Sequence, residues 1–199
     1  MYPQSLKDLI ESFKLLPGIG EKTAERLAFF LVNEDDEKTK FFADSITNAK
    51  EKIHTCSVCN NLTDQDVCDI CSNSLRDSST LCVVEDPKSI FLFEKIGTFN
   101  GKYHVLDGLI SPLDGIDPDD IGIEKLVKRV REEKFKEVII AVKPSIEGET
   151  TALYIKKILE GIKDIKVTRI ASGIPMGTDI EYIDSMTLER ALSDRKEIN

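Results

Sequence analysis

Four of the five cysteines in this 199-residue chain form two closely spaced pairs. These four are the residues of the chain best suited to chemistry. Two residues separate Cys56 from Cys59 and Cys68 from Cys71, and eight residues lie between the pairs. A two-residue gap lets both sulfur atoms of a pair converge from one tight turn, and four thiolates fill a tetrahedral site. We therefore predict one structural zinc ion per chain.

The segment between the pairs supports this prediction. It is polar and has too few apolar residues to fold by itself, so the metal would supply folding free energy directly. Two disulfides or a redox C-x-x-C are the alternatives, but nothing in the chain looks secreted, and a redox motif needs one pair rather than two. The fifth cysteine, Cys82, lies in an apolar run, where a buried strand residue is expected.

A second candidate site is the glycine bend Leu16-Pro17-Gly18-Ile19-Gly20. Amphipathic helices are expected on either side, at about 5–16 and 21–32. We expect the amides of residues 18–20 and of the first helical turn to be free and to face outward, an arrangement that suits a phosphate oxygen. Lys22 and Arg26 share one face of the second helix and could contact neighbouring phosphates. A hairpin whose glycines only permit close packing is an equal alternative.

Three glutamates are expected at strand ends. Glu85 ends an apolar run, and Glu147-Gly148-Glu149 follows a strand that ends near Val142. Carboxylates that converge at one sheet edge could hold Mg²⁺. The alternative, which we favour, is an acidic rim or a surface for docking a partner.

The elements that position these residues change in character along the chain. After the bend, a third helix is expected to reach about residue 53 and to lead into the cysteines, with Phe42, Ile46, Ala49 and Ile53 on one side. Beyond Ser72, short apolar strands at 81–85, 103–106, 137–142 and 166–170 alternate with helical patterns at about 88–96, 119–133 and 149–160. This alternation predicts an α/β fold with a parallel sheet covered by helices. A glycine-containing loop and a final short helix follow, and they could serve subunit contacts.

Composition excludes several classes of protein. The formal net charge of −9 argues against a generally basic nucleic-acid coat, although residues 1–32 are neutral overall. No apolar run is long enough to span a membrane, and no P-loop or G-x-G-x-x-G is present. We expect a cytoplasmic protein.

Several motifs resemble known families. Residues 16–28, L-P-G-I-G-E-K-T-A-E-R-L-A, resemble the helix-hairpin-helix of proteins that bind DNA without sequence specificity. The layout after the cysteines resembles the Toprim fold, although Glu-Gly-Glu replaces that family's D-x-D. The order of these parts, with S-P-L-D-G-I-D-P-D-D-I, I-E-G-E-T-T-A and G-I-P-M-G-T, resembles the bacterial recombination mediator family RecR along essentially the whole chain.

The resemblance implies a DNA-repair protein without catalytic activity of its own. It would act with RecO and RecF at single-strand gaps and help to load RecA. Its dimers would pair into a tetrameric ring, with DNA contacted through Gly18, Gly20, Lys22 and Arg26. RecO would dock on the acidic face that carries Glu85, Glu147 and Glu149.

The resemblance also divides the chain. It implies a helix-hairpin-helix region at 1–55, a zinc finger at 56–71, a Toprim domain at 79–175 and an oligomerisation tail at 176–199. A Mg²⁺-dependent Toprim nuclease acting on DNA is the alternative function. A zinc-dependent scaffold without a DNA role is the third.

Overall fold

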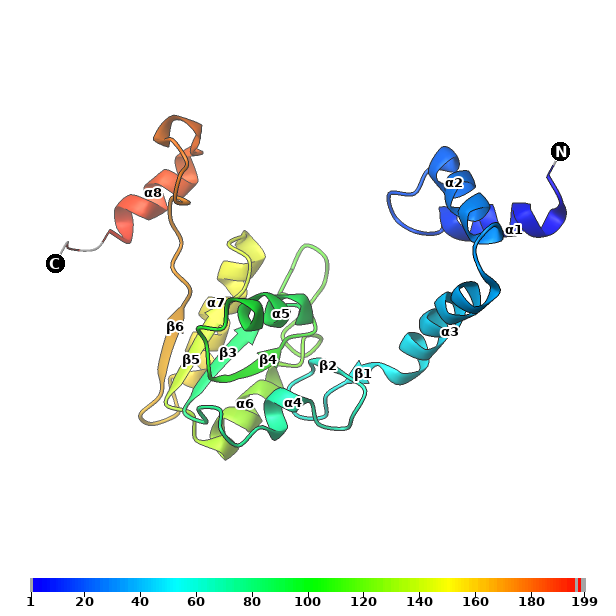
Figure 1. Cartoon of the computed structure of the whole chain (residues 1–199). Coiled ribbons are helices and arrows are strands. Elements are labelled where there is room, and N and C mark those ends of the chain that lie inside the picture. Colours follow the sequence, from blue (N-terminus) through cyan, green and yellow to red (C-terminus); the bar gives the residue numbers. More distant parts are fainter. Residues whose placement is uncertain (1, 196, 198–199) are drawn as a thin grey trace. The chain divides into compact units, whose positions relative to one another are not determined.

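The computed structural model describes residues 2–195 and 197 (Figure 1). The chain divides into two compact units, Met1–Ile53 and His54–Asn199. No helix among the described residues is long and apolar enough to cross a membrane.

The first unit is built from three helices: α1 (Gln4–Lys14), α2 (Glu21–Val32) and α3 (Asp36–Lys52). Helices α1 and α2 pack together around buried Ile10, Ala24 and Ala28. The two alanines allow the helices to approach closely because each side chain is a single methyl group. The expected pair of helices is confirmed, with the first ending two residues earlier than its predicted limit.

Helix α3 is long but buries none of its residues in this unit. Asp35 caps its start by accepting a hydrogen bond from the amide of Glu37 at 2.8 Å. Its acidic first turn and basic last turn also suit the helix dipole. The apolar face that its sequence predicts is left in water, since Phe42 is 45% exposed and Ile46 is 58% exposed.

The second unit begins with the cysteine-rich segment. Strand β1 (His54–Thr55) pairs antiparallel with β2 (Leu62–Thr63), and the one-turn helix α4 (Asp69–Ser72) follows. The two cysteine pairs lie on either side of β2, so this small hairpin brings them together. Few apolar residues belong to this segment, as the sequence indicates.

A four-stranded parallel sheet forms the centre of the second unit. Its strands are β3 (Thr80–Val84), β4 (Lys102–Val105), β5 (Glu137–Ala141) and β6 (Lys166–Arg169), and their spatial order is β4-β3-β5-β6. All three neighbouring pairs are parallel. From β3 the chain moves to one side of the sheet to form β4, and it then moves to the other side to form β5 and β6. The carboxyl ends of β3 and β5 therefore mark the topological switch point of the sheet.

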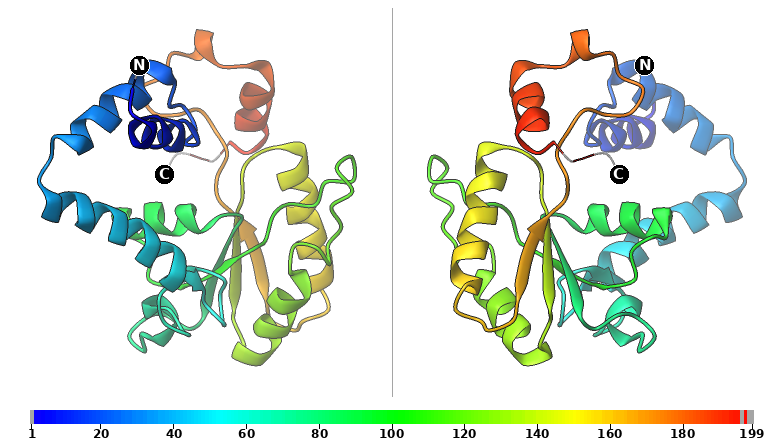
Figure 2. Two further views of the ribbon diagram at one scale, coloured as in Figure 1. Left: turned by 90° about the vertical axis from the view of Figure 1, so that its right-hand side faces the viewer. Right: turned by 90° about the vertical axis from the view of Figure 1, so that its left-hand side faces the viewer.

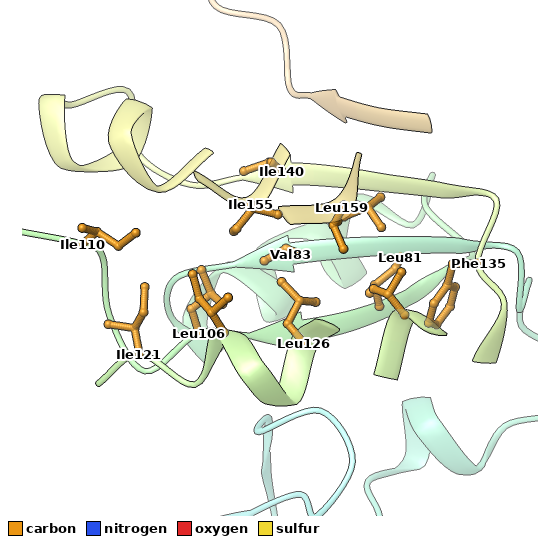
Figure 3. Packing of buried hydrophobic residues seen from close by; sticks show 13 residues of the cluster. Leu81, Val83, Leu106, Ile110, Ile121, Leu126, Phe135, Ile140, Ile155 and Leu159 are labelled. Carbon is orange, nitrogen blue, oxygen red and sulfur yellow. The ribbon is translucent and has the colours of Figure 1, made fainter. Parts of the chain in front are cut away.

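Helices cover both faces of this sheet, which confirms the predicted α/β fold. Helices α6 (Ile123–Glu133) and α7 (Ile146–Leu159) lie on one face and α5 (Pro87–Ile96) lies on the other (Figure 2). The central strand β3 serves both cores, because Leu81 and Val83 face α6 and α7 while Cys82 and Val84 face α5. Figure 3 shows the larger core, in which Leu126, Ile155 and Leu159 from the two helices meet the sheet.

The prediction for Cys82 is confirmed. Its side chain is buried within β3, and burial raises the pKa of its thiol to about 12. A thiol with such a high pKa stays protonated and is a poor nucleophile.

Two predicted helix starts are corrected by local geometry. The helix expected from about 119 begins at Ile123, because Gly122 adopts a left-handed conformation that interrupts the pattern. The helix expected from about 149 begins at Ile146, where the hydroxyl of Ser145 accepts a hydrogen bond from the amide of Gly148 at 3.2 Å. Glu147 and Glu149 therefore lie in the first helical turn.

Beyond β6 the chain runs without regular structure to a single turn, η1 (Ile180–Tyr182), and then to α8 (Ser185–Ser193) (Figure 1). The predicted glycine loop and final short helix are thus present. Asp184 starts α8 by accepting hydrogen bonds from both the amide and the hydroxyl of Thr187.

Candidate metal centre and nucleic-acid interface

The four cysteines meet at one point. Their sulfur atoms all lie within 4.8 Å of one another, and the Sγ atoms of Cys59 and Cys68 are 3.6 Å apart. In a tetrahedral zinc site with Zn–S bonds of about 2.3 Å, neighbouring sulfur atoms would be separated by about 3.8 Å. The positions of the sulfur atoms therefore fit a single zinc ion.

Backbone amides around the cluster support the same assignment. The amide of Asn61 donates to Cys59 Sγ at 3.5 Å, and the amide of Cys68 donates to Cys56 Sγ at 3.3 Å. These hydrogen bonds favour the thiolate form of the cysteines over the thiol form, as the groups that surround metal ligands commonly do. Asn60 adopts a left-handed conformation, with φ of 61°, which closes the first turn.

The protonation of the cysteines gives the physical reason for a cation. The pKa of the Cys59 thiol is raised by its hydrogen bond with Cys68, then by that with Cys71 and by burial. Four adjacent thiols cannot all lose their protons by themselves, since each thiolate repels the next. A divalent cation at the centre removes this obstacle and supplies the folding free energy that the polar segment lacks.

The cysteine-rich segment is attached to the edge of the sheet. Val105 in the edge strand β4 donates its amide to the carbonyl of Cys59 at 2.8 Å, and its carbonyl accepts from the side chain of Asn60 at 3.1 Å. The ammonium of Lys125 in α6 also donates to the side-chain carbonyl of Asn60. Since β4 has no strand neighbour on this side, the cysteine-rich segment takes that place.

The glycine bend joins α1 to α2 in the first unit. Gly18 has φ of +80°, which explains why glycine stands there. The amides of Gly18, Gly20 and Glu21 have no hydrogen-bond partner in the described residues, whereas Ile19 donates its amide to the carbonyl of Leu16 at 3.1 Å. In the first helical turn, Thr23 donates its amide to the carbonyl of Gly20 at 3.1 Å. The expectation that the amides of the bend and of the first turn are all free is therefore wrong at Ile19 and Thr23.

The two predicted cations lie beside this bend. Lys22 and Arg26 are on α2, and neither makes an ion pair within residues 2–195 or 197. Lys14 behaves differently, because its ammonium contacts Glu21 at 2.7 Å and Glu11 at 2.9 Å. Free amides at a helix N-terminus and cations without an ion-pair partner are the kinds of group that bind phosphate oxygens.

The three glutamates lie near the carboxyl ends of β3 and β5, and each has a different partner. Glu85 accepts from the amide of Lys143 at 3.3 Å, and Glu147 accepts from the hydroxyl of Ser145 at 2.6 Å. The hydroxyl of Ser145 is the first cause of the lowered pKa of Glu147. Within the part of the chain that the structure describes, the four cysteines converge closely enough to hold a metal ion, and these carboxylates do not.

Glu149 is held by two arginines that the sequence patterns did not single out. Arg169, at the end of β6, donates to both of its carboxylate oxygens, at 3.0 and 2.8 Å. Arg190, in α8, donates to one of them at 2.9 Å. An ion-paired carboxylate is a poor candidate ligand for Mg²⁺. No local pattern could have signalled these contacts, because 20 and 41 residues separate the arginines from Glu149.

Gly148 must stand between the two glutamates. A Cβ atom there would lie 1.9 Å from the carbonyl oxygen of Lys143. The backbone at the switch point is therefore packed too closely for any side chain.

Comparison with protein-family models matches each part of the chain in turn. A model of the helix-hairpin-helix of RecR matches residues 6–50, and one of its four-cysteine zinc finger domain matches residues 53–73. A Toprim domain model matches residues 79–171, and a model of the C-terminal part of RecR matches residues 173–196. The chain belongs to the RecR family. RecR membership gives it a role in DNA repair and recombination and gives its helix-hairpin-helix a role in DNA binding.

The RecR assignment also confirms the metal. The zinc finger model spans the segment in which the sulfur atoms of Cys56, Cys59, Cys68 and Cys71 converge. One structural zinc ion therefore belongs to this chain. Since all four ligands come from cysteine, the site is closed and leaves no position for a reacting water.

Proposed function

We propose that this protein is a recombination mediator that holds the sugar-phosphate backbone of DNA as an oligomeric clamp. It would act with RecO and RecF to load RecA at gaps, without catalysing a reaction itself. In this proposal Gly18, Gly20, Lys22 and Arg26 contact DNA, and the face that carries Glu85, Glu147 and Glu149 receives RecO. The regions 1–55, 56–71, 79–175 and 176–199 divide these tasks as the sequence suggests.

The observation that carries the DNA contact is the pair of uncommitted cations beside the glycine bend. Phosphate contacts of this kind add affinity without reading sequence. A single bend with two cations binds weakly, so the proposal requires several copies acting together. The overall charge of −9 agrees with this requirement, because a chain of net negative charge has no general attraction for DNA.

The exposed apolar surface of the first unit supports the oligomer. A groove of about 690 Å³ in this unit is lined by Glu34, Glu37 and Lys38 and by six apolar side chains from α1, α2 and α3, namely Phe13, Leu27, Phe30, Leu31, Phe41 and Phe42. Phe30 is 61% exposed and Phe41 is 75% exposed, so the groove leaves large aromatic rings in water. Contiguous apolar surface of this kind is typical of a contact with another protein surface. A second copy of the chain is the partner that the proposal requires.

The test is a charge reversal with a matched control. Lys22→Glu combined with Arg26→Glu should weaken binding to two unrelated oligonucleotides equally, by at least about tenfold at fixed salt. The slope of log affinity against log salt should fall by about one for each phosphate that is no longer neutralised. Fluorescence anisotropy titrations would measure both quantities.

Lys40→Glu with Lys50→Glu is the control, because these lysines on α3 carry the same charge and lie away from the bend. Equal weakening by both pairs would assign the effect to overall charge. Unchanged affinity in the first pair would remove the bend from the DNA contact. The Mg²⁺-dependent nuclease would replace the mediator if the purified protein cut DNA and Glu147→Gln abolished the cutting.

A further inference from the structure

Lys102 is a buried cation next to the zinc site. It lies in the edge strand β4 and is only 8% exposed. Its ammonium donates three hydrogen bonds, to the carbonyls of Ile70 at 2.9 Å, Cys71 at 3.0 Å and Asn73 at 2.9 Å. All three carbonyls belong to the turn that carries the zinc ligand Cys71.

The charge of Lys102 has no carboxylate partner within the described residues. Arg129, the other cation among the buried residues, pairs with Glu133 at 2.8 Å. Arg76, which is partly buried, pairs with Glu94 at 2.8 Å. Removing an ammonium from water without a negative partner is costly, even when carbonyls satisfy its protons.

The zinc site provides the missing negative charge. A divalent ion with four thiolates carries a net charge of −2, and that charge is also largely buried, since Cys56, Cys59 and Cys68 are each at most 3% exposed. We propose that Lys102 is the counter-charge of the zinc–tetrathiolate centre. Because Lys102 belongs to the sheet, its charge couples the binding of zinc to the attachment of the cysteine-rich segment to the sheet.

A plainer role must be separated from this one. A lysine can cap the last carbonyls of a helix by hydrogen bonding alone, and α4 ends at this point. The two roles differ in what the position requires. A counter-charge requires a cation, whereas a cap requires only a donor.

Three substitutions in the full chain separate the two roles. Lys102→Met removes both charge and donors, Lys102→Gln keeps donors without charge, and Lys102→Arg keeps both. Competition with a chromophoric chelator would measure zinc affinity, after Co²⁺ absorption has shown an intact tetrahedral thiolate site. We expect Met and Gln to weaken zinc binding by about 10- to 100-fold, as outer groups around a metal do. Arg should stay within about threefold of the unmodified chain.

Lys95→Met is the control, because this lysine is exposed and lies on α5, outside the cysteine-rich segment. The zinc affinity of this variant should be unchanged. A Gln variant with unaltered affinity would show that hydrogen bonding suffices and would overturn the proposal. Failure of Met and Gln to fold while Arg folds would support it. Failure of all three to fold would overturn it, because geometry rather than charge would then be what the position demands.

A change at the metal gives an independent measurement. Cys71→His would lower the net charge of the centre from −2 to −1, because a neutral imidazole replaces a thiolate. If Lys102 balances that charge, the loss of zinc affinity caused by Lys102→Gln should be several-fold smaller in the protein with a histidine ligand. An equal penalty in both backgrounds would contradict a counter-charge role.

Discussion

His104 is a buried residue whose surroundings disfavour its charged form. It is fully buried in β4, and its Nε2 atom has no hydrogen-bond partner in the described residues. Burial, and then the positive charges of Arg129 and Lys125, lower its pKa to about 3. The histidine is therefore neutral in the folded protein throughout the physiological range.

We predict that this histidine makes the fold sensitive to acid. The unfolded chain takes up a proton below about pH 6.5 while the folded chain does not, so stability falls as the pH drops from about 6.5 toward 3. The loss is about 1.4 kcal/mol for each pH unit in this window. Urea unfolding at pH 7 and at pH 5.5 would measure this effect. Between these two pH values, the free energy of unfolding of His104→Leu should fall by about that amount less than the free energy of unfolding of the unmodified chain.

The exposed His54 serves as the control, since it is the only other histidine of the chain. His54→Leu should keep the full acid sensitivity. Identical pH dependence in the unmodified chain and in His104→Leu would contradict the assignment.

At the scale of single residues, sequence could predict those whose signal is local. The zinc ligands could be predicted because the two residues within each pair impose the geometry. The DNA contact of Lys22 and Arg26, which share one helix, stays a prediction. Lys102 and Arg190 gave no such signal. Their partners come from distant segments, and a lone lysine between a glycine and a predicted strand has no feature that points to a special role.

Among the elements, the start of α7 and the final helix α8 are connected by charge. Glu149 in α7 bridges Arg169 at the end of β6 and Arg190 in α8, and Arg169 also lies 3.6 Å from Asp194. These side chains are between 32% and 47% exposed, so each pair stabilises the contact by no more than about 1 kcal/mol.

We predict that Glu149→Gln loosens α8. Losing the carboxylate should raise hydrogen exchange of amides in residues 185–193 about fivefold, which corresponds to about 1 kcal/mol. Mass spectrometry of peptides would measure it, with peptides from α5 as an internal reference. Glu160→Gln, at the exposed far end of α7, should leave exchange in α8 unchanged. Equal acceleration by both variants would argue against the bridge.

The order and type of the elements could be predicted, but not all of their limits. Alternation of apolar strands and helical patterns indicated the parallel sheet correctly. The helix expected at about 119 starts later because Pro118 and Gly122 stand around its expected first turn, and periodicity alone does not weigh such residues. The pattern on α3 predicted an apolar face but could not say that this unit leaves the face exposed.

For the whole molecule, the exposed groove of the first unit leads to a prediction about assembly. Phe41→Asp combined with Phe42→Asp places two charges in the groove and should lower the mass of the assembly in solution. Light scattering during size-exclusion chromatography would measure it. DNA affinity should fall with the mass, because separate bends no longer act together.

Leu113→Asp is the control for surface charge. Leu113 is 98% exposed and lies in a loop of the second unit, outside the groove. It should leave the mass unchanged. An aspartate pair that keeps the full assembly would exclude the groove as a subunit contact.

The attachment of the cysteine-rich segment to β4 has a consequence for how the protein tolerates removal of its metal. Several backbone groups of this strand are occupied by partners outside the sheet: the amide and carbonyl of Val105 by Cys59 and Asn60, and the carbonyl of Tyr103 by Arg129. Chelation would free the backbone amide and carbonyl of Val105 and expose β4 as an edge strand. Exposed edge strands pair with strands of other chains, so the chelated protein should precipitate as intermolecular β-structure instead of only unfolding.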